Sequence, residues 1–180
     1  MRHLPRARRE AQRLLREAGI KTTRVPVDKI AAEYAEIHER HLEEDIAGML
    51  VPLPEPPGQK RWAIVLNENH SKTRKRFTLA HELGHLILHG YTTAHADGPF
   101  LVRFRDARSS DGSVREEIEA NEFAAELLMP NEMLIERLRS HRLEYAPFDD
   151  EASGRIIKEI AKEFDVSKAA LQIRLANLIS

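Results

Sequence analysis

The chain has 180 residues, 42% of them hydrophobic and 32% charged, which fits one globular domain of ordinary size. Its 28 basic and 29 acidic residues leave a formal net charge of -1, so we expect no overall attraction to nucleic acid or to an anionic membrane. The absence of cysteine excludes disulfides, thiolate zinc sites, iron–sulfur clusters and a cysteine nucleophile, so a metal site must use histidine and carboxylate.

No targeting or membrane-spanning segment is expected. The first residues are basic, but they lack the apolar core of roughly 7–15 residues that a secretory signal requires. Charged residues interrupt every hydrophobic run before the roughly 18–20 residues that are needed to cross a bilayer. We therefore expect a cytoplasmic protein that does not bind membranes.

The first third of the chain predicts two helices followed by two strands. Apolar residues recur at helical spacing over residues 6–19, ending at Gly19, and again over residues 27–39. Residues 46–51 and 61–67 are short β-like runs, and the proline-rich segment between them predicts an exposed loop.

The middle of the chain predicts a long helix and a third strand. Residues 71–89 return to helical spacing and end at Gly90. Residues 99–105 alternate between apolar and polar side chains, and the proline that begins them favours an edge strand. Residues 106–113 are rich in Ser, Asp and Gly, which predicts a loop.

The last third of the chain predicts four helices. They cover residues 114–129, 131–141, 152–164 and 168–179. The predicted fold is therefore α+β, with helices packed around a small three-stranded sheet. We expect a single domain over residues 1–180, which includes a C-terminal helical pair at 152–179.

The strongest functional signal is His81-Glu82-Leu83-Gly84-His85, an HExxH motif inside the long predicted helix. Residues four apart share one face of a helix, so both imidazoles can bind one ion. Glu82 then points toward a water molecule on that ion, as in a zincin-like active-site helix. Zinc suits this set because it binds neutral imidazole nitrogens and keeps a fourth position open for water in catalytic sites.

A catalytic zinc site normally has a third protein ligand. The candidates are His89, Asp97, Asp106 and the acidic residues at positions 116–126. On a regular helix His89 is rotated about 80° from His81, so these two cannot share an ion unless the helix breaks. For His89 we instead expect contact with the helix dipole or with a neighbouring group.

The helix predicted at residues 114–129 separates its acidic side chains onto two faces. Glu117 shares a face with apolar residues, and a carboxylate in that position needs a partner such as a metal. Glu119, Glu122 and Glu126 form an acidic stripe, for which we expect a solvated face. Glu117 is therefore the predicted third zinc ligand.

Two further roles stay open from the residues alone. Asn121 lies one turn after Glu117, so it is placed either to hydrogen-bond a zinc ligand or simply to pack in the interior. Tyr91 and His95 follow the HExxH helix, where they could stabilise an oxyanion or have ordinary surface or packing roles.

The two predicted helices together resemble a known family. Residues 77–89 read FTLAHELGHLILH and residues 117–130 read EIEANEFAAELLMP, a pair of motifs similar to that of the ImmA/IrrE family of zinc metallopeptidases. The resemblance implies a gluzincin-like zinc endopeptidase with Glu82 as the catalytic base. It also implies zinc ligation by His81, His85 and Glu117.

The resemblance further implies a regulatory protease. Family members typically cleave or inactivate helix-turn-helix repressors that control mobile elements or stress responses. Some carry an added repressor-like or sensor domain, for which we expect no room here, so the repressor is expected to be a separate protein. In the implied mechanism Glu82 takes a proton from the zinc-bound water, which attacks the peptide carbonyl, and then returns the proton to the leaving amine.

The C-terminal helical pair supports an alternative function. Residues 160–175 read like a helix-turn-helix in which Ser167 caps the second helix, although Asp165 occupies the turn position that usually carries glycine. The polar residues expected on the surface of that helix are Lys168, Gln172 and Arg174. The chain would then be a DNA- or protein-binding regulator with a vestigial or purely structural zinc site. Because three polar residues make a thin phosphate footprint, we do not expect direct nucleic-acid binding.

Two segments are candidates for substrate recognition. The strand predicted at residues 100–105 could be an exposed edge that pairs with an extended substrate segment. Main-chain pairing is poorly selective, so specificity for a repressor would need a further surface, for which the 152–179 helical pair is the candidate. The same pair could equally be plain scaffold.

Overall fold

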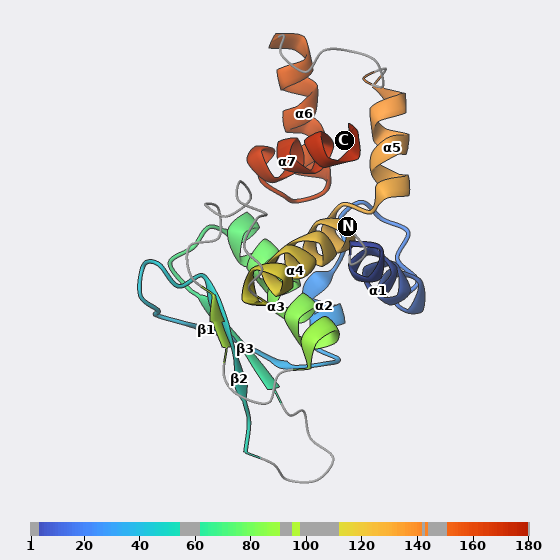
Figure 1. Ribbon diagram of the computed structural model, residues 1–180. Helices are drawn as coiled ribbons and strands as arrows, with labels where there is room; N and C mark the ends of the chain where they lie inside the picture. The colour runs from blue at the N-terminus through green and yellow to red at the C-terminus, as the bar shows by residue number, and fades with distance from the viewer. Residues whose placement is uncertain are drawn as a thin grey trace.

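The structure is a computed structural model that describes residues 4–54, 62–90, 95–97, 112–141, 143 and 151–179. A small sheet lies at one end of the molecule and three C-terminal helices lie at the other (Figure 1). The helices between them carry the HExxH motif and the predicted third ligand. The predicted α+β class is confirmed, whereas the single-domain prediction is not tested by the structure.

The sheet has the strand order β1-β3-β2-β4 within the described residues. Strands β2 (Gly48–Pro52) and β3 (Trp62–Asn67) are antiparallel and agree with the two strands predicted in this region. Strand β1 (Glu36–Arg40) pairs with β3 in parallel, and these three strands form the body of the sheet. A three-residue strand, β4 (His95–Asp97), extends it by pairing antiparallel with β2.

The helix predicted over residues 27–39 was too long. Helix α2 covers only Val27–Ala31, and the chain turns before it enters β1. Five residue pairs join β1 to β3, from Glu36 opposite Ala63 to Arg40 opposite Asn67. The predicted helix failed because this long-range pairing overrides a local apolar spacing that suits either structure.

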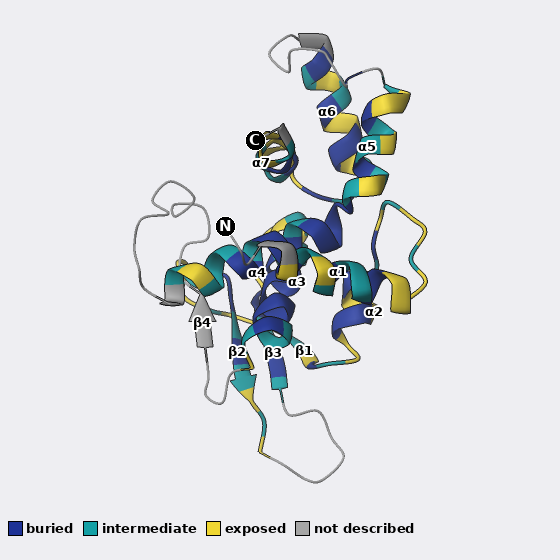
Figure 2. Ribbon diagram, turned by 45° about the vertical axis from the view of Figure 1, so that its right-hand side comes forward, coloured by how far each residue is buried: buried dark blue, intermediate teal, exposed yellow. Residues whose placement is uncertain are grey.

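Helix α3 (Lys72–His89) is the centre of the fold and covers the length predicted for it. Ser71 caps its start by accepting a hydrogen bond from the Arg74 amide at 3.4 Å. Gly90 ends it in the left-handed conformation with φ 59°, which glycine adopts without steric cost. Every position from Thr78 to His85 is buried, and so is Leu88, so α3 is enclosed on several sides (Figure 2).

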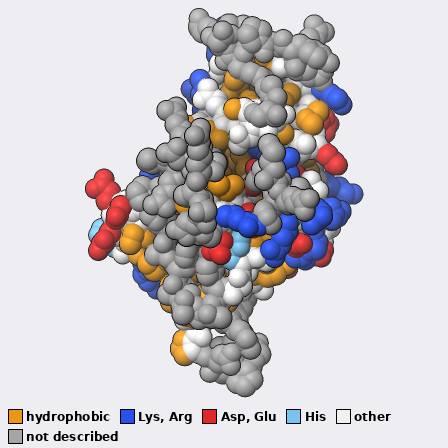
Figure 3. Space-filling model, viewed as in Figure 1, with side chains coloured by type: hydrophobic (Ala, Val, Ile, Leu, Met, Phe, Trp, Pro, Cys, Tyr) orange, Lys and Arg blue, Asp and Glu red, His pale blue; other side chains and the backbone are white. Residues whose placement is uncertain are grey.

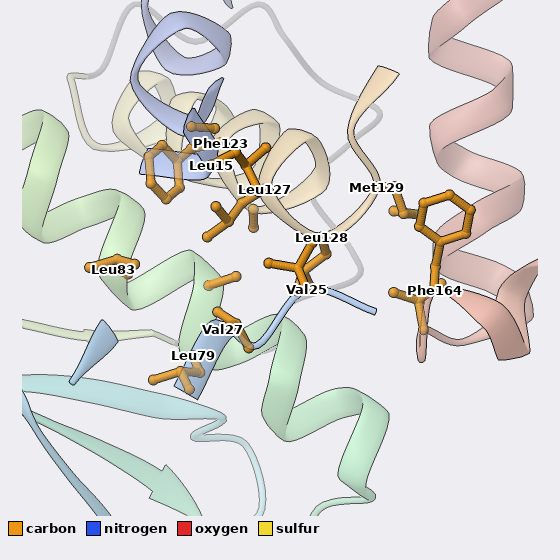
Figure 4. Close-up of a cluster of buried hydrophobic side chains, with 14 of the residues drawn as sticks. Leu15, Val25, Val27, Leu79, Leu83, Phe123, Leu127, Leu128, Met129 and Phe164 are labelled. Atoms are coloured by element: carbon orange, nitrogen blue, oxygen red, sulfur yellow. The ribbon is translucent and has the colours of Figure 1, made fainter. Parts of the chain in front are cut away.

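Two other helices complete the core around α3. Helix α4 (Gly112–Leu128) packs along α3, and α1 (Leu4–Glu17) packs on α4. Their contact is lined by fully or nearly fully buried side chains such as Leu15, Leu83, Phe123 and Leu127 (Figure 4). The sheet contacts α3 through β2 and β3, so α3 lies between the sheet and α4.

Helices α5 (Asn131–Ser140), α6 (Glu151–Glu163) and α7 (Lys168–Ile179) agree with the last three predicted helices. The turn between α6 and α7 contains Asp165 with a positive φ of 54°, at the position where glycine is usual in a helix-turn-helix. Its carboxylate lies 2.9 Å from Arg24 and 3.5 Å from Arg76, two cations of the central layer. This turn is therefore attached to the rest of the molecule by charge as well as by packing.

Two predictions on chain organisation stay untested. The strand at residues 99–105 and most of the loop at 106–113 lie outside the described residues. Among the described residues, no helix combines the length and hydropathy that a bilayer span requires. The cytoplasmic location stays a prediction.

Candidate metal centre

Helix α3 presents the HExxH side chains in the interior of the molecule. His81, Glu82 and His85 each have 0% exposure. The rings of the two histidines lie with centroids 4.5 Å apart, as expected for residues four apart on one helical face. Their Nε2 atoms approach to 2.8 Å, so these nitrogens point at one another.

Helix α4 brings a carboxylate to the same point. The Glu117 side chain lies 3.2 Å from His85 Nε2 and 3.5 Å from His81 Nε2. One ligand atom from each of the three residues falls within a group no wider than 4.8 Å. The structure thus brings together, from the two helices α3 and α4, the three residues that the sequence proposes as ligands.

The spacing of these three ligand atoms fits a single small cation. Ligands on a tetrahedral zinc with bonds of about 2.0–2.1 Å lie about 3.3–3.4 Å apart. The two Nε2 atoms are 2.8 Å apart, Glu117 Oε1 lies 3.2 Å from His85, and Glu117 Oε2 lies 3.5 Å from His81, so the separations bracket that value although two carboxylate oxygens share them. Two neutral imidazoles and one carboxylate also match the composition of zinc sites that keep a position for water.

Asn121 holds one of the two imidazoles in a defined orientation. Its Oδ1 lies 3.2 Å from His81 Nδ1. Because an amide oxygen only accepts hydrogen bonds, this contact assigns the ring proton of His81 to Nδ1 and leaves the Nε2 lone pair directed at the three-residue cluster. Of the two roles left open for Asn121, the geometry fits the support of a ligand.

The backbone of strand β2 passes close to Glu82. A Cβ atom built on Gly48 would lie 3.1 Å from Glu82 Oε1 and 2.5 Å from Thr78 Cγ2. Any side chain at position 48 would therefore displace Thr78 and crowd the Glu82 carboxylate. Sequence reasoning missed Gly48, because its contact with α3 is formed only when the sheet packs on that helix.

His89 stays outside the three-residue cluster, as the helical rotation predicts. Its Nε2 lies 3.3 Å from the backbone oxygen of Glu116, and its ring centroid is 5.5 Å from that of His85. Burial lowers the pKa of His89, and the neighbouring His85 lowers it further. The side chains of Asp97, Asp106, Tyr91 and His95 lie outside the described residues.

The predicted solvated face of α4 is wrong. Glu119, Glu122 and Glu126 are only 5%, 7% and 1% exposed. Helix α1 covers this side, with Arg8 Nε 2.5 Å from Glu122 and Gln12 Nε2 3.0 Å from Glu126. The periodicity of one helix could not reveal a second layer that supplies cations and amides to an acidic stripe.

Arg174 of α7 was also misplaced by the sequence. It is 1% exposed, donates to Glu122 at 3.0 Å and forms an ion pair with Glu126. A signal was present, because Arg174 lies on the apolar stripe of α7 with Leu171, Leu175 and Leu178. Lys168 and Gln172 are exposed, as expected. Arg174 therefore connects α7 to the interior of α4.

Comparisons with known proteins place the chain in a known family. The family Peptidase_M78, described as an IrrE N-terminal-like domain, matches residues 16–176. The chain is similar to the radiation response metalloprotease IrrE of Deinococcus radiodurans, with 34% identity over 109 residues, which cover 59% of this chain and 28% of that protein. It is also similar to the uncharacterized immunity region protein 2 of Bacillus phage phi105, with 41% identity over 68 residues, or 38% of each protein. The matched part thus spans less than half of either relative.

Proposed function

The chain belongs to the Peptidase_M78 family, and from that premise we propose that it is a zinc-dependent endopeptidase of the HExxH, gluzincin-like type. The observation that carries the proposal is the cluster of His81, His85 and Glu117, whose spacing suits one tetrahedral ion. A bound zinc would supply a Lewis acid for the peptide carbonyl and lower the pKa of a water molecule there to about 7.

The residues of this chain then have distinct tasks. His81 and His85 direct ring nitrogens at the ion, and Asn121 fixes the proton of His81 on the far nitrogen. Glu82 accepts a proton from the attacking water and returns it to the leaving amine. Burial of Glu82 between α3 and β2 keeps its carboxylate in one place between these two steps.

We propose further that the substrate is a helix-turn-helix repressor, so that the protease is regulatory. The support comes from the family resemblance and from the names of the two relatives, one a radiation response metalloprotease and one an immunity region protein. Such a substrate would be a separate protein.

The alternative of a DNA-binding regulator is not favoured. It depended on three polar residues at the surface of α7, of which Arg174 is buried in ion pairs. Lys168 and Gln172 alone make a smaller phosphate footprint than the three residues together.

A cleavage assay tests the proposal. The zinc-loaded chain is incubated with helix-turn-helix repressors from the same genome, and the products are identified by mass spectrometry. We expect one or a few defined cuts by the wild type and none by Glu82→Gln, which keeps its zinc because Glu82 is not a ligand. Intact repressor with both proteins, or equal cleavage by both, would contradict the proposed activity.

A further inference from the structure

A cavity of about 260 Å³ lies between the first half of α3, the second half of α4 and α7. Figure 3 views the face on which hydrophobic side chains gather in a recess below the C-terminal helices. Much of the cavity wall is apolar, and its apolar residues include Phe77, Met129, Val166 and Ile173. The C-terminal helical pair thus builds one wall of a space whose other walls belong to the helices of the metal centre.

The cavity borders residues that surround the candidate metal centre, although His81, His85 and Glu117 do not themselves line it. Asn121 lines it and also contacts His81 at 3.2 Å. Thr78, which lines it as well, lies one turn before His81 on α3. A peptide bound at the metal cluster is therefore expected to have this cavity near it.

The chemistry of the wall selects an uncharged occupant. The buried charges at the wall belong to Glu122 and Arg174, which pair at 3.0 Å. Each has a second partner of opposite charge, Arg8 for Glu122 and Glu126 for Arg174, so the charges of the four groups balance. Arg74, which also lines the cavity, is exposed to solvent. A charged side chain would lose its hydration here and find no free counter-charge in this pair, whereas an apolar one gains by leaving water.

The size of the cavity suits one large side chain. Pockets for small-molecule ligands typically hold about 300–1,000 Å³. At about 260 Å³ this cavity is just below that range, and large enough for a leucine, methionine or phenylalanine side chain.

We propose that this cavity receives a large apolar side chain next to the bond that is cleaved, so that α7 is a specificity element of the peptidase. The inference rests on the proposed function, because it names a substrate feature for that same site. It gives the C-terminal helical pair a role in recognition that requires neither DNA nor a charged surface.

Two exposed alanines on α7 allow a matched test. Ala169 lines the cavity, whereas Ala176 lies two turns further along the same helix and does not. Ala169→Phe is expected to fill the cavity, and Ala176→Phe adds the same apolar area outside it. Both positions are exposed, so neither variant should change the thermal melting curve by more than the small effect typical of surface sites.

The first measurement needs no activity. Methyl NMR spectra are recorded while N-acetylleucinamide, and separately N-acetylglycinamide, is titrated in the millimolar range. We expect the leucine compound to shift the methyl signals of Val166 and Ile173 in the wild type and in Ala176→Phe, but not in Ala169→Phe. Equal shifts with both compounds, or unchanged leucine binding in Ala169→Phe, would overturn the proposal.

The second measurement maps cleavage sites in unfolded casein by mass spectrometry. We expect the wild type and Ala176→Phe to prefer Leu, Met or Phe over Gly at one position beside the cut by about ten-fold or more. Ala169→Phe should lose that preference and favour small residues. Cleavage without an apolar preference would contradict the cavity assignment. If casein is not cut at all, the titration decides the cavity assignment, and the repressor assay separately decides the proposed activity.

Discussion

The buried cluster around Arg174 yields a prediction of a large stability loss, where the sequence alone would have predicted a small one. Arg174 is 1% exposed and pairs with Glu122 and Glu126, which are 7% and 1% exposed. Arg174→Leu removes the cation and leaves Glu126 without its ion pair in the interior. Breaking one side of a buried ion pair in this way typically costs about 3–5 kcal/mol.

The size of this effect separates a buried cluster from a surface pair. An exposed ion pair contributes only about 0–1 kcal/mol. In a protein of this length each kcal/mol lowers Tm by about 2–4 °C, so Arg174→Leu should lower Tm by about 6–20 °C. The exposed neighbours on α7 provide the controls, since Lys168→Ala and Gln172→Ala should stay within about 0.5 kcal/mol of the wild type.

Urea unfolding of the metal-free proteins, followed by circular dichroism, measures these differences without a contribution from metal binding. A second variant, Arg174→Leu with Glu122→Gln and Glu126→Gln, should recover part of the loss because it removes the buried charges that were left behind. An Arg174→Leu variant less than about 1 kcal/mol below the wild type would refute the buried cluster.

Three other predictions concern the metal centre. Loss of a ligand's hydrogen-bond partner typically lowers metal affinity by up to about 100-fold, and Glu117→Ala, which removes a ligand, should lower zinc affinity by more than that. Glu119→Ala should keep zinc affinity near the wild-type value. Isothermal titration with zinc compares the two variants, and equal losses would contradict the ligand assignment. Gly48→Ala should reduce kcat while the zinc content stays unchanged. In the control Gly154→Ala the added Cβ meets nothing closer than 3.8 Å, so kcat should stay at the wild-type value. A wild-type kcat for Gly48→Ala would show that the strand does not position the catalytic base. Because the folded-state pKa of His89 is lowered, protonation of His89 favours the unfolded chain, so the free energy of unfolding should decline as the pH falls below about 6.5. In urea unfolding series between pH 7.5 and 5, His89→Gln should show a smaller decline than the wild type. Parallel curves for the two proteins would exclude a contribution of His89.

The candidate metal centre was predictable because its information is local. The HExxH residues lie within five positions of one helix, and helical periodicity alone chose Glu117 from among several acidic residues. The structure brings these residues to 2.8–3.5 Å of one another. The expected contrast between faces fails, however, because Glu117 is partly exposed whereas Glu119, Glu122 and Glu126 are buried. The same periodicity argument predicted that His89 lies outside the cluster, and the structure agrees, since His89 contacts the backbone oxygen of Glu116 instead.

The failed predictions share one physical origin, which is packing between distant segments. Residues 36–39 have a spacing that a helix could use, but β3 offers them a parallel partner. Glu122 and Glu126 look like a solvated stripe until α1 and α7 are packed against α4. A single sequence contains no measure of such contacts, although a lone arginine on the apolar stripe of α7 could have warned of a buried partner.

The central claim is that His81, His85 and Glu117 hold one zinc ion. An anomalous difference map collected from zinc-loaded crystals on both sides of the zinc absorption edge tests it most directly. The account predicts one strong peak about 2.0–2.1 Å from both Nε2 atoms and about 2.0–2.2 Å from a Glu117 oxygen. A peak bound elsewhere in the molecule, or none at this cluster at full zinc loading, would contradict it.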